Sequence, residues 1–185
     1  MQTGTTKVSE KGPSRGRGHD GEGERRMYKS PSHLSEGARA KIADGLNARL
    51  ADGLDLFSQI KFAHWNLKGP HFAALHPLFE TFAESLSEHN DDIAERAVTL
   101  GARAYGTVRQ AGKASKLAEY PHDVQRDLEH VALLADRIEK YLEGLRETRE
   151  MAENNGDVDT HDMITLIVTE FEKHAWFLRA TLEGA

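Results

Sequence analysis

Apolar residues recur at steps of three and four in four stretches of the chain, which is the period of an amphipathic helix. The clearest stretch is 72–101, and another, 35–60, begins with Ser35, a good helix N-cap. A third stretch follows Pro121, and a fourth begins near Asp159. The apolar positions of the 72–101 stretch are Phe72, Leu75, Phe79, Phe82, Leu86, Ile93, Ala97 and Leu100.

No stretch shows the alternation typical of a strand, so the chain is predicted to be all-α. The first two helices, like the last two, have a short connection, whereas residues 102–120 form a long one. A four-helix bundle with one long crossover between helices 2 and 3 is the ferritin-like arrangement, not a simple up-and-down bundle. Gly45 and Gly53 each weaken the first helix by about 1 kcal/mol relative to Ala, and we expect them to permit close helix packing.

The 72–101 helix also carries a polar face. At about 100° per residue, four side chains of metal-ligand type fall within roughly 100° of arc on a different side from the apolar stripe. Charged residues on a helix face are usually just solvated, but small residues between them would let a neighbouring backbone approach closely. The ligand-type residues are His76, Glu80, Asp91 and Glu95, and the small ones are Ala73, Ala83, Ser87 and Ala94.

One copy of this helix cannot close a metal site. Glu80 and Asp91 lie about 16 Å apart along the axis, far beyond the reach of one ion. An antiparallel second copy, related by a two-fold axis between positions 85 and 86, would place position 76 opposite 95 and position 80 opposite 91. Two equivalent sites about 20 Å apart would then form. His64 could reach the same site from the end of the preceding helix.

Two imidazoles and three carboxylates form a ligand set suited to iron, manganese or zinc. The chain has no cysteine, which excludes disulfides, iron–sulfur clusters and thiolate sites. Iron is the leading candidate. A single-chain di-iron oxygenase is disfavoured because two helical Glu-x-x-His motifs are missing, and the one such spacing, Glu119 to His122, contains Pro121.

The run HWNLKGPHF, then His76 and Glu80, then DDIAERAVTLG, resembles the signature of the Dps mini-ferritins, the DNA-binding proteins from starved cells. KLAEYP and EFEKHAWFLRATLE extend the resemblance over residues 35–183. Glu80 stands where many members carry Asp, which lengthens the carboxylate's reach by one methylene. The resemblance implies a ferroxidase centre in which His64, His76 and Glu80 of one subunit face Asp91 and Glu95 of a two-fold mate.

The resemblance also implies the activity and the assembly. We expect Fe²⁺ to be oxidised by hydrogen peroxide more readily than by oxygen and stored as ferric oxyhydroxide in a hollow dodecamer of two-fold dimers. Zinc or manganese in the same site is the alternative metal. A short helix around Val108 to Lys113 is expected in the crossover. Trp65 is expected beside the site, either to intercept oxidising equivalents or simply buried in the interface.

Residues 1–33 differ from the bundle domain, 34–185, because they are rich in Gly, Ser, Arg and Lys and nearly free of large apolar side chains. Such a segment is predicted to be a flexible tail. Residues 1–35 carry a net charge of +3 and the rest −9. Non-specific DNA binding through the tail, with nucleoid compaction as the main role, is therefore the alternative function. The basic residues are Lys7, Lys11, Arg15, Arg17, Arg25, Arg26 and Lys29.

Three aspartates, Asp157, Asp159 and Asp162, cluster before the fourth helix. Asp159 suits its N-cap and Asp162 its first turn, where negative charge favours the helix dipole. The resemblance adds a second role, as carboxylates lining three-fold pores through which Fe²⁺ enters. Both roles can coexist. His161 within this cluster is expected to be an exposed bystander.

The remaining histidines have weaker patterns. His89 falls close to the apolar stripe and is predicted to be a core histidine with a hydrogen-bond partner. His71 is a weaker candidate for the surroundings of the metal site, and His130 and His174 lie in later helices without a carboxylate pattern.

No apolar run is long enough to span a membrane, and the N-terminus lacks the hydrophobic segment of a secretory signal. A cytoplasmic location is therefore expected.

Overall fold

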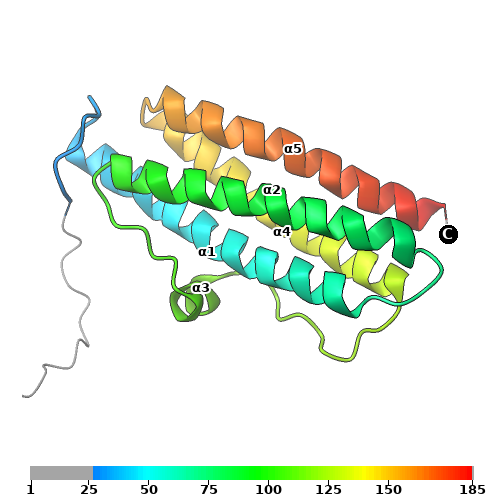
Figure 1. Cartoon of the computed structure of the whole chain (residues 1–185). Coiled ribbons are helices and arrows are strands. Elements are labelled where there is room, and N and C mark those ends of the chain that lie inside the picture. Colours follow the sequence, from blue (N-terminus) through cyan, green and yellow to red (C-terminus); the bar gives the residue numbers. More distant parts are fainter. Residues whose placement is uncertain (1–26, 185) are drawn as a thin grey trace, which may run out of the picture.

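Five helices form the part of the chain that the computed structural model describes, residues 27–184. They are α1 (Glu36–Asn66), α2 (Phe72–Thr99), α3 (Val108–Ala114), α4 (Asp127–Asn154) and α5 (Val158–Glu183). Figure 1 shows α1 and α2 as one antiparallel pair and α4 and α5 as the other, with α3 in the crossover packed to the side of α1. Within residues 27–184 there is no strand, only an isolated bridge between Lys68 and Arg126. The predicted all-α bundle with a long crossover is confirmed.

A local capping signal sets the start of α1. Ser35 Oγ accepts from Ala38 N at 3.2 Å and starts α1 as predicted. The helix continues past the predicted end at Ile60 to Asn66, which puts His64 in its last turn.

The N-cap of one helix and the start of another were predicted wrongly. Asp157, not Asp159, is the N-cap of α5, and its carboxylate accepts from Thr160 N at 3.1 Å. Asp162 therefore falls beyond the first turn. The third long helix begins at Asp127 and not directly after Pro121, because the intervening residues pair with the α1–α2 turn.

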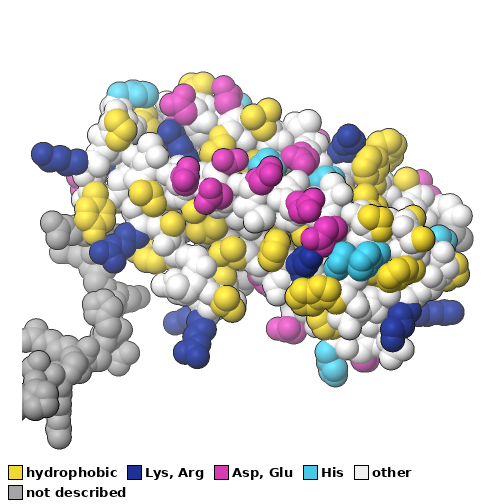
Figure 2. Space-filling model, in the orientation of Figure 1, with side chains coloured by type: hydrophobic (Ala, Val, Ile, Leu, Met, Phe, Trp, Pro, Cys, Tyr) yellow, Lys and Arg dark blue, Asp and Glu magenta, His cyan; other side chains and the backbone are white. Residues whose placement is uncertain are grey.

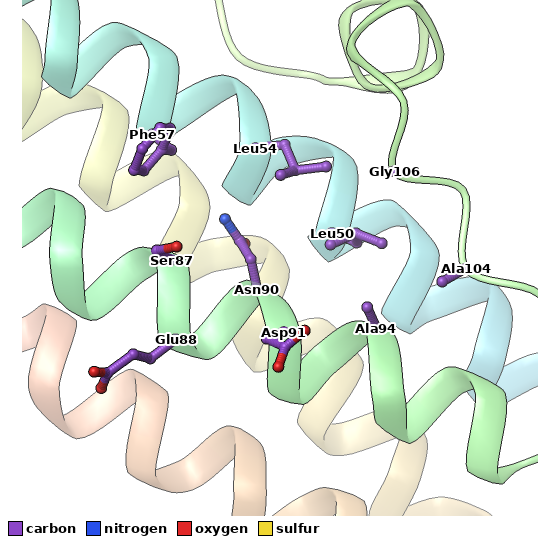
Figure 3. A pocket seen from close by; sticks show the side chains of 10 residues that line it. All are labelled: Leu50, Leu54, Phe57, Ser87, Glu88, Asn90, Asp91, Ala94, Ala104 and Gly106. Atoms are coloured by element: carbon purple, nitrogen blue, oxygen red, sulfur yellow. The ribbon is translucent and has the colours of Figure 1, made fainter.

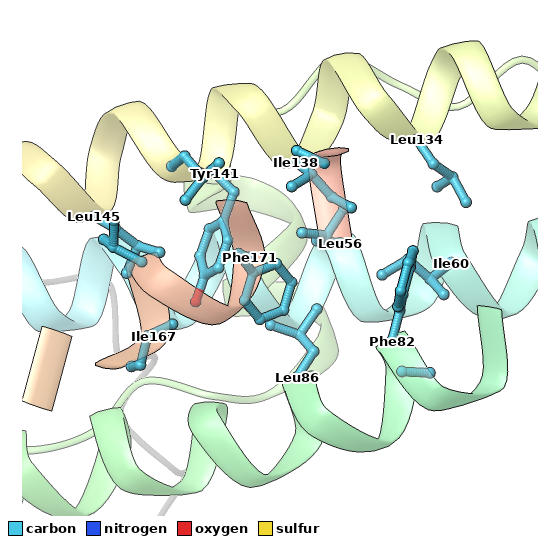
Figure 4. Close-up of a cluster of buried hydrophobic side chains, with 14 of the residues drawn as sticks. Leu56, Ile60, Phe82, Leu86, Leu134, Ile138, Tyr141, Leu145, Ile167 and Phe171 are labelled. Atoms are coloured by element: carbon cyan, nitrogen blue, oxygen red, sulfur yellow. The ribbon is translucent and has the colours of Figure 1, made fainter. Parts of the chain in front are cut away.

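The core is built from the apolar faces of the four long helices. Figure 4 shows Tyr141 of α4 and Phe171 of α5 among side chains of α1 and α2, and their rings meet edge to face at 5.5 Å. Fully burying such side chains contributes about 1.5–3 kcal/mol each. The predicted stripe of α2 is buried except for Phe72, which is 46% exposed. Phe72 opens the helix, beyond the reach of the core, and stacks on His76 instead.

Close approach of helices explains Gly53. A Cβ at this position would lie 2.0 Å from Asn90 Oδ1 of α2, so the predicted role of a glycine in close packing is confirmed here.

The segment before α1 contacts the far end of α2. Tyr28 N donates to Gly101 O at 2.7 Å, and Ser30 Oγ donates to Thr99 O at 2.7 Å. Gly101 has φ +92°, and a Cβ there would lie 2.5 Å from Tyr28 O. Residues 28–30, although within the stretch predicted to be a tail, are therefore held against the bundle.

Candidate metal centre

Two histidines face each other where α1 ends and α2 begins. The rings of His64 and His76 stack with centroids 3.8 Å apart. His64 Nδ1 lies 2.8 Å from His76 O, and His76 Nδ1 lies 3.0 Å from His64 O. A carbonyl oxygen only accepts, so each Nδ1 carries the hydrogen. In the neutral ring, each Nε2 is then left with a lone pair for a metal ion.

The end of α1 shortly after His64 makes this reciprocal pairing possible. In a continued helix the His64 carbonyl would accept from the N–H of residue 68. Instead, α1 ends, and Lys68 N donates to Gln125 O at 3.0 Å. The freed carbonyl of His64 is the acceptor for His76.

Glu80 is the third member of the group, one turn beyond His76. Its Oε2 lies 3.3 Å from His64 Nε2. With the neutral tautomer of His64, both atoms present lone pairs to each other. Such an arrangement is stabilised by a cation between them, and the donor types suit Fe²⁺.

Lys61 supplies a positive charge at this position. Its Nζ lies 2.5 Å from Glu80 Oε2. The hydrogen bond and the charge of Lys61 outweigh partial desolvation and lower the pKa of Glu80. Sequence reasoning missed Lys61. The only signal was its place one turn before His64 in the same helix.

Asp91 and Glu95 lie further along α2, and both are exposed. Nothing in a single chain brings them to the histidines. Within residues 27–184, no three His, Cys, Asp or Glu side chains of one chain are arranged to hold a metal ion. The expected ligands therefore fall into two separate groups in one chain: His64, His76 and Glu80 where α1 ends and α2 begins, and Asp91 and Glu95 further along α2.

A largely apolar groove adjoins Asp91. It has a volume of about 560 Å³, and Figure 3 shows Leu50, Leu54 and Phe57 of α1 along one side and Ser87, Asn90 and Ala94 of α2 along the other. A second groove, of about 590 Å³, shares Leu54 and Phe57 and continues past Lys61 and Trp65 to α3. Large apolar side chains stand out beside it: Trp65 is 69% exposed and Val108 is 89% exposed. Such exposed apolar surface is typical of an interaction site.

Carboxylates extend along α2 between the two groups of expected ligands. Figure 2 shows a band of acidic side chains on this face of the molecule. The exposed acidic residues of α2 are Glu84, Glu88, Asp91, Asp92 and Glu95. The band makes the surface attractive to cations.

The three aspartates at the start of α5 have different surroundings. Asp157 is buried, with Oδ1 2.6 Å from Arg96 Nη2 of α2. The side chains of Asp159 and Asp162 are 82% and 72% exposed. Of the three aspartates, only these two have exposed side chains. His161, the predicted bystander, contacts Asp162 at 3.0 Å.

Other histidines have protein partners. His89 is half-buried, and its Nε2 lies 2.7 Å from Glu170 Oε2, which confirms the predicted hydrogen-bond partner but not full burial. His130 is fully buried, with Nδ1 2.7 Å from the Tyr120 hydroxyl. Burial lowers the pKa of His174 to about 4, which keeps it neutral near pH 7.

The predicted basic residues of the tail lie outside the described residues, except for Lys29, which is exposed. Within residues 27–184, no helix has the length and apolar character needed to cross a membrane.

The crossover bundle and the paired histidines beside Glu80 define a protein of the ferritin-like class, and the family model of the ferritin-like domain matches residues 43–185. Within that class the chain belongs to the Dps family. It is 35% identical over 158 residues to the DNA protection during starvation protein of Agrobacterium fabrum, covering 85% of this chain and 98% of the relative.

Solved structures give the same result. The Dps of Mycobacterium smegmatis has a TM-score of 0.81 at 29% identity, covering 85% of this chain and 94% of that one. The Dps of Vibrio cholerae, described as a member of a broad superfamily of ferritin-like diiron-carboxylate proteins, has a TM-score of 0.79 at 29% identity over 86% and 99% of the two chains.

Proposed function

We propose that this protein is a ferroxidase that binds Fe²⁺ as its substrate between two subunits, oxidises it with hydrogen peroxide or oxygen, and stores the ferric product in a hollow shell. The observation that carries the proposal is the reciprocal histidine pair. Because each Nδ1 is occupied by the other residue's carbonyl, both Nε2 atoms are reserved for a ligand beside the Glu80 carboxylate.

The second half of each centre would come from a two-fold mate. An antiparallel copy of α2 about the point between residues 85 and 86 brings Asp91 opposite Glu80 and Glu95 opposite His76. The apolar grooves flanking this line would be covered in the same contact. A dodecamer built from such dimers is the assembly we propose.

Lys61 has a defined part in this scheme. It neutralises Glu80 until Fe²⁺ arrives, and its ammonium must then move away, since two cations at one carboxylate repel each other. Two Fe²⁺ ions together supply the two electrons that, with two protons from solvent, reduce one hydrogen peroxide to two water molecules. No hydroxyl radical needs to form, so storage and detoxification are one activity. Manganese and zinc suit the same ligands and are competing ions.

For the path of Fe²⁺ into the shell we propose Asp159 and Asp162, repeated around a three-fold pore. Asp157 is committed to Arg96 and to the α5 N-terminus, so we leave it out of the pore.

Changing His64 and His76 to Gly tests the centre. The fast phase of peroxide-driven Fe²⁺ oxidation should disappear while the mass of the assembly stays the same, because both rings lie at the helix ends and not in the core. His122→Gly, an exposed histidine of the crossover, is the matched control and should keep the fast phase. An unchanged initial rate in the double variant would sink the assignment.

DNA binding is the second candidate, and the positive charge of the N-terminal residues favours it. Several relatives carry the name DNA protection during starvation protein. Multiplied over an assembly, a weakly basic segment gives salt-sensitive binding through avidity, with a cytoplasmic, nucleoid-associated location.

A variant beginning at Met27 tests the tail more cleanly than one beginning at His33, because it retains Tyr28 and Ser30 against α2. Full-length protein should retard DNA at low salt, and the shortened protein should not. Equal retardation by both would rule out the tail.

A further inference from the structure

The turn between α1 and α2 carries one site histidine on each side, and it is tied to α4. Lys68 N donates to Gln125 O, and Asp127 N donates to Lys68 O, both at 3.0 Å. These two bonds form the isolated parallel bridge between Lys68 and Arg126. The distance between the two histidines therefore depends on where the start of α4 lies.

Asp127 is the centre of this attachment. It is 5% exposed, and its Oδ2 accepts from His71 N at 2.8 Å and contacts His71 Nδ1 at 3.1 Å. Its Oδ1 accepts from Leu128 N at 2.9 Å. His71 is the N-cap residue of α2, and Leu128 lies in the first turn of α4. One carboxylate therefore satisfies donors at two helix N-termini, where negative charge is favoured.

The charged form of Asp127 is the stable one. Burial alone would raise the pKa of this carboxyl, but hydrogen bonds from His71 and Leu128 outweigh it and lower the pKa. The attachment therefore persists throughout the neutral range.

Gly69 allows the turn backbone to pack closely against Asp127. Its φ is +156°, and a Cβ there would lie 2.3 Å from the Asp127 carboxyl carbon. The carboxylate packs directly on the turn backbone, so a shift of α4 at this point would be transmitted to the turn.

We propose that Asp127 is a positioning residue for the metal centre: through His71 and Lys68 it fixes the α1–α2 turn, and so sets how His64 and His76 face each other. It touches neither site histidine. The inference rests on the proposed function and deepens it, since it adds a residue from α4 to a centre otherwise drawn from α1 and α2.

Titration of the full-length assembly with Co²⁺, followed by visible absorption, tests this directly. Asp127→Asn preserves the shape but removes the charge, and it should weaken Co²⁺ binding about tenfold, the lower end of the effect of residues that orient metal ligands. The KM for Fe²⁺ should rise more than kcat falls. Asp52→Asn is the control, because Asp52 is also buried and accepts from a backbone N–H, that of Lys116 at 2.8 Å, but away from the turn. Asp52 also pairs with the buried Arg49 at 3.0 Å, so the affinities are compared between assemblies of wild-type mass.

Wild-type Co²⁺ affinity in Asp127→Asn, or an equal loss in Asp52→Asn, overturns the inference. Should Asp127→Asn fail to assemble, His71→Ala keeps the backbone bond and should weaken Co²⁺ binding about fivefold, the equivalent of one hydrogen bond; unchanged affinity there overturns the inference. If instead the wild type binds Co²⁺ no better than the His64 and His76 double variant, the proposed function fails.

Discussion

At the scale of single residues, the sequence was enough to propose the candidate ligands, but not which ring nitrogen of each histidine carries the hydrogen. Spacing and side-chain chemistry were enough to select His64, His76 and Glu80. The reciprocal use of the two Nδ1 atoms depends on where each backbone carbonyl points after α1 ends. That direction is set by contacts with residues 125–127, about sixty positions away in the chain.

At this scale we predict how Lys61 affects the affinity of the centre for Co²⁺. Replacing it with Gln removes a cation that competes for Glu80, so Co²⁺ binding at pH 7 should strengthen by about two- to fivefold, as for a single ion pair close to the protein surface. The same change removes the main cause that lowers the pKa of Glu80. The carboxylate will then protonate at a higher pH, so the acid limit of Co²⁺ binding should shift upward.

Titrations at several pH values measure both effects, and Lys113→Gln, an exposed lysine of α3, is the control. Weaker binding at pH 7 would show that Lys61 organises the centre and does not compete for it.

At the scale of helices, periodicity predicted all four long elements because each buries one face. Helix ends were predicted well where the signal is local, as at Ser35, and poorly where several aspartates compete. Asp157 is the N-cap of α5 because Arg96 of α2 holds its side chain in place. The contact joins two helices, so the local sequence around Asp157 does not indicate it.

The α5 cap yields the prediction for an element. Asp157→Ala removes an N-cap and leaves Arg96 without its closest partner, so it should lower the free energy of unfolding by about 2–4 kcal/mol. Asp159→Ala, whose side chain is 82% exposed, should change it by no more than about 0.5 kcal/mol. Thermal unfolding at one protein concentration compares the two. Equal effects of both substitutions would mean that Asp157 does not cap the helix.

At the scale of the whole molecule, the proposed centre requires a partner, because its ligands fall into two separate groups in one chain. Ser87 is exposed and lies beside the expected two-fold axis. Position 87 falls opposite Glu84 of the mate, because facing positions sum to 171. Ser87→Glu would therefore bring like charges together at both ends of the contact, so sedimentation should show smaller species and the fast Fe²⁺ oxidation should be lost with them. Glu150→Arg, on the exposed face of α4, is the control and should leave both unchanged. Smaller species that keep full oxidation would show that one chain is sufficient.

The sequence by itself determined the helical bundle and the crossover, and it supplied the candidate ligands with the spacing in α2 on which the proposed two-fold contact rests, because all of these follow from periodicity along single helices and from side-chain chemistry. Only the tertiary structure decided which atoms meet: Lys61 on Glu80, Asp127 on the α1–α2 turn, and Asn90 against Gly53. The reason is physical. Residue spacing fixes positions within one helix, whereas contacts between helices depend on how whole faces pack and where each connecting turn directs the chain.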